Sequence, residues 1–414
     1  MSPLVYLLES QLRFLLRNGN VTSWPVLGQA YAWDNHTVIH GYTQPPSVHP
    51  AGQLSEIQFH AVPTVAALQG CELLIPSILE KQKMPQPTLL VFLALDADEA
   101  YQLAFLVLDD SLPVRCTVKL IPTESDLYSR SKGLLETDVL AAKTVGIVGL
   151  GSGGSPIAVE LAKAGIGHFV LIDFDRLELS NVARHVCGTS DLGRFKTFAV
   201  RDAIHQRNPH AHVRTLEIDV NLNRDECSSA LTDADLIICA SDNDRSRFFL
   251  NEIALKFRIP AIFGRAITRA AGGDVLRVRP FNGPCYSCLY SQNVRQEGSD
   301  DEEISQTSQA KLLLPDYTSE DDIKASVQVG LSSDIVPISN FMTKLALVEL
   351  SKGLNSGISG LEDDFVSDFY IWANRRDGIY QTWNKLGYHF DKPTILRWYG
   401  AKVTRDSQCM VCGN

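Results

Sequence analysis

Residues 144–196 read TVGIVGLGSGGSPIAVELAKAGIGHFVLIDFDRLELSNVARHVCGTSDLGRFK, and this stretch decides the fold. Gly149, Gly151 and Gly154 have the spacing G-x-G-x-x-G between an apolar run and a helical pattern, which is the context of a nucleotide-binding turn. In such turns the first glycine allows a tight bend, the second lets a phosphate approach the backbone, and the third permits close helix packing. The spacing alone suits NAD, FAD or ATP, so it predicts a nucleotide and leaves its identity open.

Five polar residues after this turn narrow the choice of nucleotide. Asp173 ends the next apolar run and can accept hydrogen bonds from a ribose, while Asn181 and Arg184 are three apart and would share one face of a helical turn. Lys196 opens the following helix, and Asp242 follows a later apolar run in the sequence ASDN. Because the carboxyl ends of parallel strands face one crevice, we expect these groups to meet there. Two cations and a carboxylate able to hold Mg²⁺ stabilise charge on phosphate oxygens, which predicts ATP with Mg²⁺.

The alternation of strands and helices predicts an α/β fold class with a Rossmann-like, mostly parallel sheet and helices on both faces. Strands are expected at residues 145–148, 169–172, 212–218, 236–239 and 261–263. Helices are expected at residues 156–165, 195–207, 247–257 and 338–350. We expect this domain to span residues 126–414, with an acidic crossover loop at 291–326 and a metal-binding tail at 401–414.

Residues 1–125 are expected to form a smaller α/β accessory domain. Apolar runs at 89–95 and 103–108, bounded by proline and aspartate, predict two neighbouring strands, and residues 1–19 have the pattern of an amphipathic helix. Three histidines are candidate metal ligands, but no acidic partner follows at a suitable spacing. We therefore favour a structural or surface role for His36, His40 and His49.

Composition and charge limit the classes of function. The chain has 414 residues, 45% of them hydrophobic and 21% charged, which is typical of a soluble globular protein of two or three domains. Its net charge of -10 argues against nucleic acid or an anionic membrane as the main partner. The N-terminus lacks the basic start and the cleavage site of a signal peptide, so we expect a cytoplasmic protein.

Nine cysteines include two C-x-x-C pairs, Cys285/Cys288 and Cys409/Cys412. An odd total with scattered single cysteines does not indicate a secreted disulfide framework. One pair alone could be a redox site. Two pairs supply the four thiolates that a tetrahedral structural Zn²⁺ site requires, and we favour zinc.

Seven motifs together make this chain resemble the ThiF/MoeB family of ubiquitin-like-protein activating enzymes. They are YSR (128–130), VGLGSGG (148–154), LIDFDRLELSNVAR (171–184), GRFK (193–196), ASDN (240–243), GPCYSC (283–288) and CMVCG (409–413). The resemblance covers about residues 126–350 and returns at the end of the chain. It implies that ATP·Mg²⁺ and the C-terminal glycine carboxylate of a ubiquitin-like protein react to give an acyl-adenylate and pyrophosphate.

The resemblance also implies roles for particular residues. Asp173 would hold the ribose, Asp242 would bind Mg²⁺, and the phosphates would be contacted by Asn181, Arg184 and Lys196. The four cysteines match the zinc positions of the family. Arg130 matches an arginine that reaches into the partner's ATP site in family dimers, so a homodimer is expected.

The chain departs from many family members because no cysteine lies between Cys288 and Cys409, where a thioester cysteine would stand. Ala325 or Ser326 occupies the nearest position. Three explanations are open: a thiol on another protein collects the acyl group, Cys187 is the nucleophile, or a cysteine has been replaced, for example at Ala325. For Cys187 we favour a buried structural thiol.

The accessory domain and the acidic loop favour a ubiquitin-like conjugation pathway, such as that of the bacterial Bil antiviral defence operons, with a conjugating enzyme as a further partner. Activation of a sulfur carrier for thiamin or molybdopterin synthesis is the alternative. Two rivals come from other classes. An NAD-dependent oxidoreductase leaves Arg184, Lys196 and Asp242 unexplained, and a catalytically silent binding module would not need the full phosphate-contacting set.

Overall fold

The computed structural model describes residues 2–17, 23–44, 52–81, 87–96, 102–108, 112–121, 127–131, 133–267, 270–290, 330–376, 380–383 and 393–413. The chain divides into two compact units, Met1–Ser129 and Arg130–Asn414. The predicted crossover loop at 291–326, with Ala325 and Ser326, lies outside the described residues.

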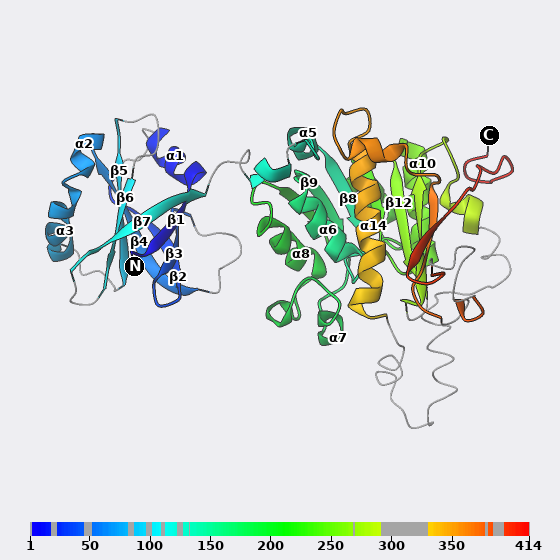
Figure 1. Ribbon diagram of the computed structural model, residues 1–414, viewed down its shortest axis with the longest axis horizontal. Coiled ribbons are helices and arrows are strands. Elements are labelled where there is room, and N and C mark those ends of the chain that lie inside the picture. Colours follow the sequence, from blue (N-terminus) through cyan, green and yellow to red (C-terminus); the bar gives the residue numbers. More distant parts are fainter. Residues whose placement is uncertain are drawn as a thin grey trace, which may run out of the picture. The chain divides into compact units, whose positions relative to one another are not determined.

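The second unit is built on an eight-stranded sheet in the order β10-β9-β8-β11-β12-β13-β14-β15 (Figure 1). The parallel strands are β8 (Thr144–Val148), β9 (His168–Ile172), β10 (His212–Leu216), β11 (Leu236–Cys239) and β12 (Ala261–Ala266). Numbered along the chain, they follow the order 3-2-1-4-5 of a Rossmann fold. The antiparallel strands are β13 (Gly272–Val278), β14 (Phe369–Ala373) and β15 (Arg397–Ala401). The five predicted strands are all present, with small differences at their ends.

Helices cover both faces of this sheet, which confirms the predicted fold class. One apolar core joins Val145 and Ile147 of β8 to the helices α6 (Gly154–Lys163), α8 (Lys196–His205) and α14 (Ser332–Leu350). These helices cross one face of the sheet in Figure 1. The second core joins Val148, which points to the opposite face, to α9 (Arg224–Leu231) and α10 (Asp244–Phe257). Alternate residues of a strand point to opposite faces, so a two-sided sheet needs apolar residues at every position.

Helix α14 packs closely on the sheet because two strands offer glycine where it crosses. A Cβ atom on Gly264 of β12 would overlap Met342, and one on Gly273 of β13 would overlap Ile338. The same helix reaches the glycine-rich turn, since the Ser339 hydroxyl donates to the carbonyl of Gly153 over 3.0 Å. Helix α14 thus supports the glycine-rich turn that is predicted to bind the nucleotide.

The first unit is a closed barrel in the strand order β1-β3-β2-β4-β5-β6-β7. The strands are β1 (Leu4–Leu8), β2 (Val26–Trp33), β3 (Val38–Tyr42), β4 (Gln53–Val62), β5 (Thr88–Ala94), β6 (Gln102–Val107) and β7 (Val114–Ile121). Its helices are α1 (Glu9–Arg17), α2 (Val65–Leu68) and α3 (Ile75–Lys81). The predicted neighbouring strands are confirmed as the antiparallel pair β5 and β6.

One prediction for the first unit is wrong in part. The segment read as a single amphipathic helix forms helix α1 only from Glu9, and residues Leu4–Leu8 form strand β1. Strand β1 pairs in parallel with both β3 and β7, so it closes the barrel and leaves no open edge. Long-range pairing therefore overrides the local helical pattern.

The candidate histidines of the first unit separate in the structure. His40 packs its ring against Tyr6 and Trp33, with centroids 5.1 and 4.8 Å away, and burial lowers its pKa. His36 lies in a turn at φ 66°, and His49 lies outside the described residues. No helix in the described parts of either unit is long and apolar enough to cross a membrane.

Candidate functional site

The register of the sheet brings the ends of the three parallel strands β9, β8 and β11 to one edge, level with Phe263 inside β12. Ile172, Val148, Cys239 and Phe263 are partners across β9, β8, β11 and β12. The residues that follow β9, β8 and β11 therefore lie at the same edge, and they are Asp173, the glycine-rich turn and the ASDN turn, respectively. This edge, with the turns after β8, β9 and β11, is called the nucleotide edge below. It includes the reversal of strand order between β8 and β11, where ligands of this fold class bind.

The three glycines of the turn have distinct geometric roles. Gly149 has φ +85°, and a Cβ atom there would lie 2.7 Å from the amide nitrogen of Ser241 in the ASDN turn. A Cβ on Gly154, the first residue of α6, would overlap the carbonyl oxygen of Gly149. A Cβ on Gly151 would meet nothing within 4 Å, so its backbone borders open space. Only Gly151 thus leaves room for a ligand, while the other two allow the bend and the helix contact.

Asp173 fixes the glycine-rich turn to the end of β9. Its Oδ2 atom accepts from the amide of Leu150 over 2.6 Å, and its Oδ1 atom accepts from the amide of Asp175 over 2.8 Å. Burial raises the pKa of Asp173, and the charge of Lys196 and the two amides oppose that shift. A carboxylate has lone pairs beyond these two bonds, so Asp173 can still accept from a ribose hydroxyl.

Lys196 begins α8 and points into the same edge. Its side chain is 10% exposed, and its Nζ atom lies 2.6 Å from Oδ2 of Asp175, a carboxylate that is 47% exposed. A buried ammonium paired with a half-exposed carboxylate can exchange that partner for a phosphate that enters the edge. The sequence predicted Lys196 as a phosphate contact but did not predict its pairing with Asp175.

Asn181 and Arg184 follow β9 in a short helix and its exit. Helix α7 covers only Leu179–Val182, and Asn181 closes its start by accepting from the amide of Glu178 over 3.0 Å. Arg184 lies in the turn after the helix, where its amide donates to the carbonyl of Asn181 over 2.9 Å. The two residues therefore lie on one turn of helical type, as predicted, although α7 itself ends at Val182; their contact with phosphates stays a prediction.

His185 is a residue of this edge that the sequence reasoning missed. Its Nδ1 atom accepts from the amide of Cys187 over 3.0 Å, and its Nε2 atom lies 2.7 Å from the carbonyl of Leu150. Since Nδ1 is an acceptor, Nε2 carries the proton and donates to Leu150. Burial lowers the pKa of His185 and favours this neutral form. Leu150 is thus held on one side by Asp173 and on the other by His185.

Asp242 lies exposed in the turn between β11 and α10. Asn243 caps α10 by accepting from the amide of Ser246 over 2.9 Å. The guanidinium of Arg247 donates to the carbonyl of Ser241 over 2.8 Å, and this bond ties the turn to helix α10. The turn is thus held by Asn243 and Arg247 while its carboxylate is exposed, and a carboxylate oxygen is the type of ligand that a hard cation such as Mg²⁺ prefers.

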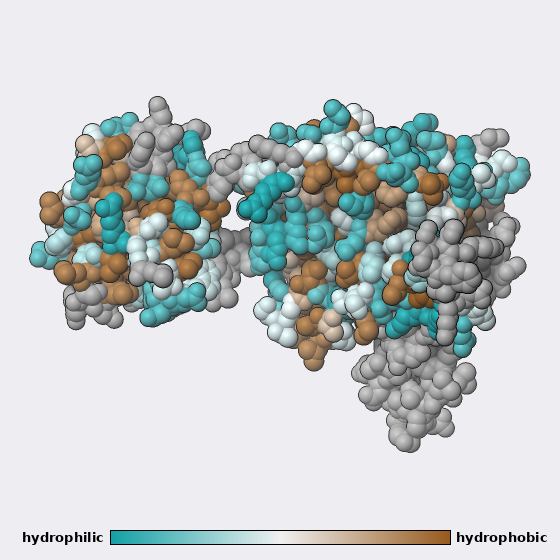
Figure 2. Space-filling model, viewed as in Figure 1, coloured by the Kyte–Doolittle hydropathy of each residue, from teal (hydrophilic) through white to brown (hydrophobic). Residues whose placement is uncertain are grey.

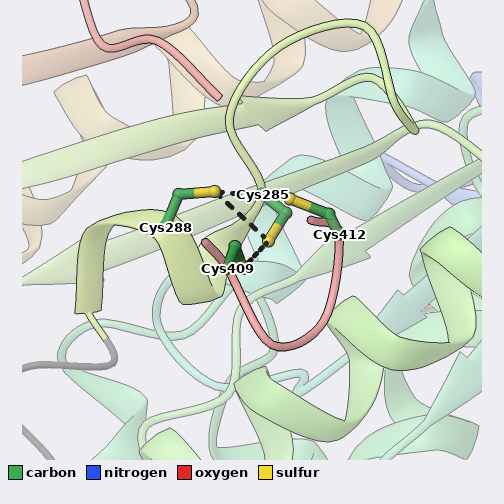
Figure 3. Close-up of side chains that lie close together, drawn as sticks. All are labelled: Cys285, Cys288, Cys409 and Cys412. Carbon is green, nitrogen blue, oxygen red and sulfur yellow. Dashed lines mark hydrogen bonds between the residues drawn. The ribbon is translucent and has the colours of Figure 1, made fainter. Parts of the chain in front are cut away.

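The two cysteine pairs converge on one point (Figure 3). The sulfur atoms are 3.7 Å apart for Cys285 and Cys288, 3.7 Å for Cys285 and Cys409, and 3.4 Å for Cys288 and Cys412. Four thiolates at about 2.3 Å from a tetrahedral Zn²⁺ ion are about 3.8 Å apart, and these four sulfur atoms all lie within 4.8 Å of one another, so the cluster suits a zinc ion. It leaves no position for a substrate, because all four ligands come from protein. The donor set therefore supports a structural metal.

Two further candidates are placed by the structure. Arg130 is exposed in the short helix Ser129–Ser131. Cys187 is buried in the core under α6 and α8, and burial together with the charge of Asp191 raises its pKa to about 12. A thiol with that pKa is almost entirely protonated at neutral pH, which favours the structural role expected for it.

The fold and the nucleotide edge define a Rossmann-like nucleotide-binding protein. The model of the ThiF family matches residues 127–375, and the chain belongs to that family. Similar proteins include an adenylyltransferase and sulfurtransferase MOCS3 from Culex quinquefasciatus, with 32% identity over 42% of this chain and 40% of the relative. The adenylyltransferase and sulfurtransferase UBA4 of Meyerozyma guilliermondii is 30% identical over 35% of this chain and 33% of the relative.

Solved structures give a more distant likeness. A crystal structure of E. coli MccB aligns with 70% of this chain and 73% of its own chain, at 20% identity and a TM-score of 0.49. The chain spans about two fifths of the length of the sequence relatives it matches. The match to the family model confirms the resemblance expected from the seven motifs, and the activity of the whole protein is a matter for proposal.

Proposed function

We propose that this protein uses ATP to adenylate the C-terminal glycine carboxylate of a ubiquitin-like protein and releases pyrophosphate. The observation that carries the proposal is the nucleotide edge, where open backbone at Gly151, a buried Lys196 and an exposed Asp242 follow neighbouring strands. Membership of the ThiF family and the printed names of its relatives, which include adenylyltransferase, support the same reaction.

The reaction joins two anions, so charge neutralisation and positioning carry the catalysis. A carboxylate oxygen attacks the α-phosphorus, and the bond from that phosphorus to the bridging oxygen of pyrophosphate breaks. Lys196 and Arg184, with Asn181, contact the phosphates, and Asp173 binds the ribose. Asp242 would hold Mg²⁺, and the ion would supply positive charge to offset that of the leaving pyrophosphate. Holding both reactants at one edge contributes up to about 7–11 kcal/mol.

The acyl group then moves to a thiol on another protein, because this chain has no cysteine between Cys288 and Cys409. Exposed apolar side chains beside the site support docking of protein partners. Phe174 and Leu179 are 56% and 72% exposed, and the surface over α7 is brown in Figure 2. Arg130 reaches the ATP site of a second copy in a homodimer, and the barrel of residues 1–125 recruits the ubiquitin-like protein or a conjugating enzyme.

We place this activity in the cytoplasm, in a conjugation pathway of the kind found in Bil-type antiviral defence operons. A second candidate is activation of a sulfur carrier. The printed names of the relatives favour it, since they combine adenylyltransferase with sulfurtransferase. The barrel unit and the acidic segment 291–326 are the features that favour conjugation.

Exchange of labelled pyrophosphate into ATP tests the proposal. We expect exchange only when Mg²⁺ and a ubiquitin-like protein with an intact C-terminal glycine are both present. Arg184→Ala is expected to abolish it. Arg214→Ala is the matched control, because Arg214 is an exposed arginine on strand β10 of the same sheet. Exchange that continues after removal of the terminal glycine would contradict the proposal.

A further inference from the structure

The first cysteine pair encloses a tyrosine that is completely buried. Tyr286 lies between Cys285 and Cys288 and has an exposed fraction of 0%. Its ring packs against Phe263 of β12 and Phe248 of α10, with centroids 5.0 and 5.1 Å away. Its amide donates to Oδ1 of Asn251, also in α10, over 2.9 Å. The cysteine turn is thus tied to α10 by backbone and ring contacts.

The hydroxyl of Tyr286 reaches the start of α10, at the nucleotide edge. It donates to Oδ1 of Asp244 over 2.8 Å, and Asp244 is the first residue of that helix. An O–H group inside a dry core needs an acceptor, so this bond fixes the ring and the helix start relative to one another. Asp244 is two residues after the exposed Asp242.

A second contact continues from Asp244 into the ASDN turn. The Nη1 atom of Arg247 donates to Oδ1 of Asp244 over 2.9 Å, and its Nη2 atom donates to the carbonyl of Ser241 over 2.8 Å. The Arg247 side chain is 8% exposed, whereas its partner Asp244 is 44% exposed, so the buried guanidinium holds both acceptors from the protein side. Ser241 also lies against Gly149, as the position of a Cβ on that glycine indicates. An unbroken series of contacts therefore joins the cysteines to both turns of the nucleotide edge.

We propose that Tyr286 is a positioning residue that links the four-cysteine site to the turn carrying Asp242. Metal bound by the cysteines holds the turn of Cys285 and Cys288, and the Tyr286 hydroxyl holds Asp244, Arg247 and the ASDN turn in place. The metal site thereby sets the position of the carboxylate that binds Mg²⁺. The statement that Asp242 binds Mg²⁺ rests on the proposed function of the nucleotide edge. The statement that Tyr286 holds the ASDN turn in place does not depend on that function.

Tyr290 offers a matched control on the same turn. Its ring lies 4.4 Å from that of Tyr286, it is also buried, and its hydroxyl donates to Oδ1 of Asp274 over 3.0 Å. Asp274 of β13 is paired with Arg265 of β12 and not with a residue of the ASDN turn. Tyr290→Phe and Tyr286→Phe therefore remove the same group from similar surroundings, but only Tyr286→Phe cuts the link.

The first measurement is hydrogen–deuterium exchange of residues 240–246 in the zinc-loaded protein. Tyr286→Phe is expected to speed exchange in this peptide about tenfold, and Tyr290→Phe is expected to leave it unchanged. Removing zinc with a chelator is expected to speed hydrogen–deuterium exchange of the same peptide in the wild-type protein. In Tyr286→Phe, where exchange is already fast, zinc removal is expected to increase the rate little further. Zinc content is expected to stay at one ion per chain in both variants. Unchanged exchange in Tyr286→Phe, an equal effect of Tyr290→Phe, or loss of zinc from Tyr286→Phe would overturn the inference.

The second measurement is calorimetric binding of ATP with and without Mg²⁺. Tyr286→Phe is expected to weaken binding of Mg·ATP about tenfold and to change binding of metal-free ATP less, because the link acts through Asp242. Asp244→Ala removes the acceptor of the Tyr286 hydroxyl without changing a cysteine, and it is expected to behave like Tyr286→Phe. Wild-type affinity in both variants would contradict the link. Absence of Mg·ATP binding in the wild-type protein would refute the proposed function, and the exchange measurement would still decide the positional inference.

Discussion

The two halves of the large sheet use charged residues in opposite ways. At the end of the parallel half, the charged groups of the nucleotide edge are only partly neutralised: Asp242 is exposed and Lys196 has a single half-exposed partner. In the antiparallel half, Arg277 of β13 is 1% exposed and contacts three carboxylates, those of Glu349, Glu362 and Asp368. Charged groups that are exposed or only partly paired are available to bind a ligand, whereas charged groups that are paired with one another stabilise the fold. The difference predicts separate effects of mutation in the two halves.

The largest effect is expected at the open edge. Asp242→Ala should reduce pyrophosphate exchange by about 10³-fold or more, because it removes the proposed ligand of Mg²⁺ and leaves the charge of the phosphates less well neutralised. Its melting temperature should stay within about 2 °C of the wild type, since exposed groups contribute little to stability. Exchange assays and calorimetry measure both quantities. A variant that exchanges pyrophosphate at the normal rate would remove Asp242 from the mechanism.

The opposite result is expected in the antiparallel half. Arg277→Met should lower the free energy of unfolding by about 3–5 kcal/mol, because the buried carboxylate of Glu349 loses its ion-pair partner and Glu362 and Asp368 keep only Arg279. Arg279, which is 21% exposed and shares two of these carboxylates, provides the matched control, and Arg279→Met should cost less. Urea unfolding gives both values. Folded Arg277→Met should bind ATP with wild-type affinity. A selective loss of ATP affinity would contradict the claim that the charged groups of the antiparallel half serve stability and not ligand binding.

An intermediate effect is expected at the four-cysteine site. Cys409→Ser should lose the metal and lower the melting temperature by several degrees, because the tail is no longer held to the cysteine turn. Cys227→Ser replaces a buried cysteine outside the cluster and should keep the metal. Elemental analysis and thermal unfolding test this. Full zinc content in Cys409→Ser would argue against the tetrahedral site.

The smallest effect is expected from His185. Burial lowers its pKa from 6.5, and the charges of Lys196 and Arg184 act in the same direction while the Leu150 contact and Asp191 oppose them. The unfolded chain therefore takes up the proton first, so stability is full above about pH 6.5 and falls as the pH drops below it. His185→Gln should reduce this dependence by about 1 kcal/mol or less. Urea midpoints between pH 5 and 8 measure it, and an unchanged pH profile would show that His185 does not contribute.

The sequence predicted the second unit well because its signals are local. A glycine-rich turn, apolar runs of strand length and paired cysteines each report on a few neighbouring residues, and the parallel sheet then brings Asp173 and Asp242 to one edge. The barrel was not predicted, because its closure depends on pairing of Leu4–Leu8 with Val114–Ile121, which are far apart in the chain. His185 was missed for a related reason, since its partners Leu150 and Cys187 become apparent only once two turns meet.

The most direct test of the central claim is calorimetric titration of the wild-type protein with Mg·ATP and, separately, with NAD. We predict that Mg·ATP binds at least about tenfold more tightly than NAD, and that Asp242→Ala removes the advantage of Mg²⁺ while Arg214→Ala keeps it. Tighter binding of NAD, or an affinity for Mg·ATP that Asp242→Ala leaves unchanged, would contradict the account.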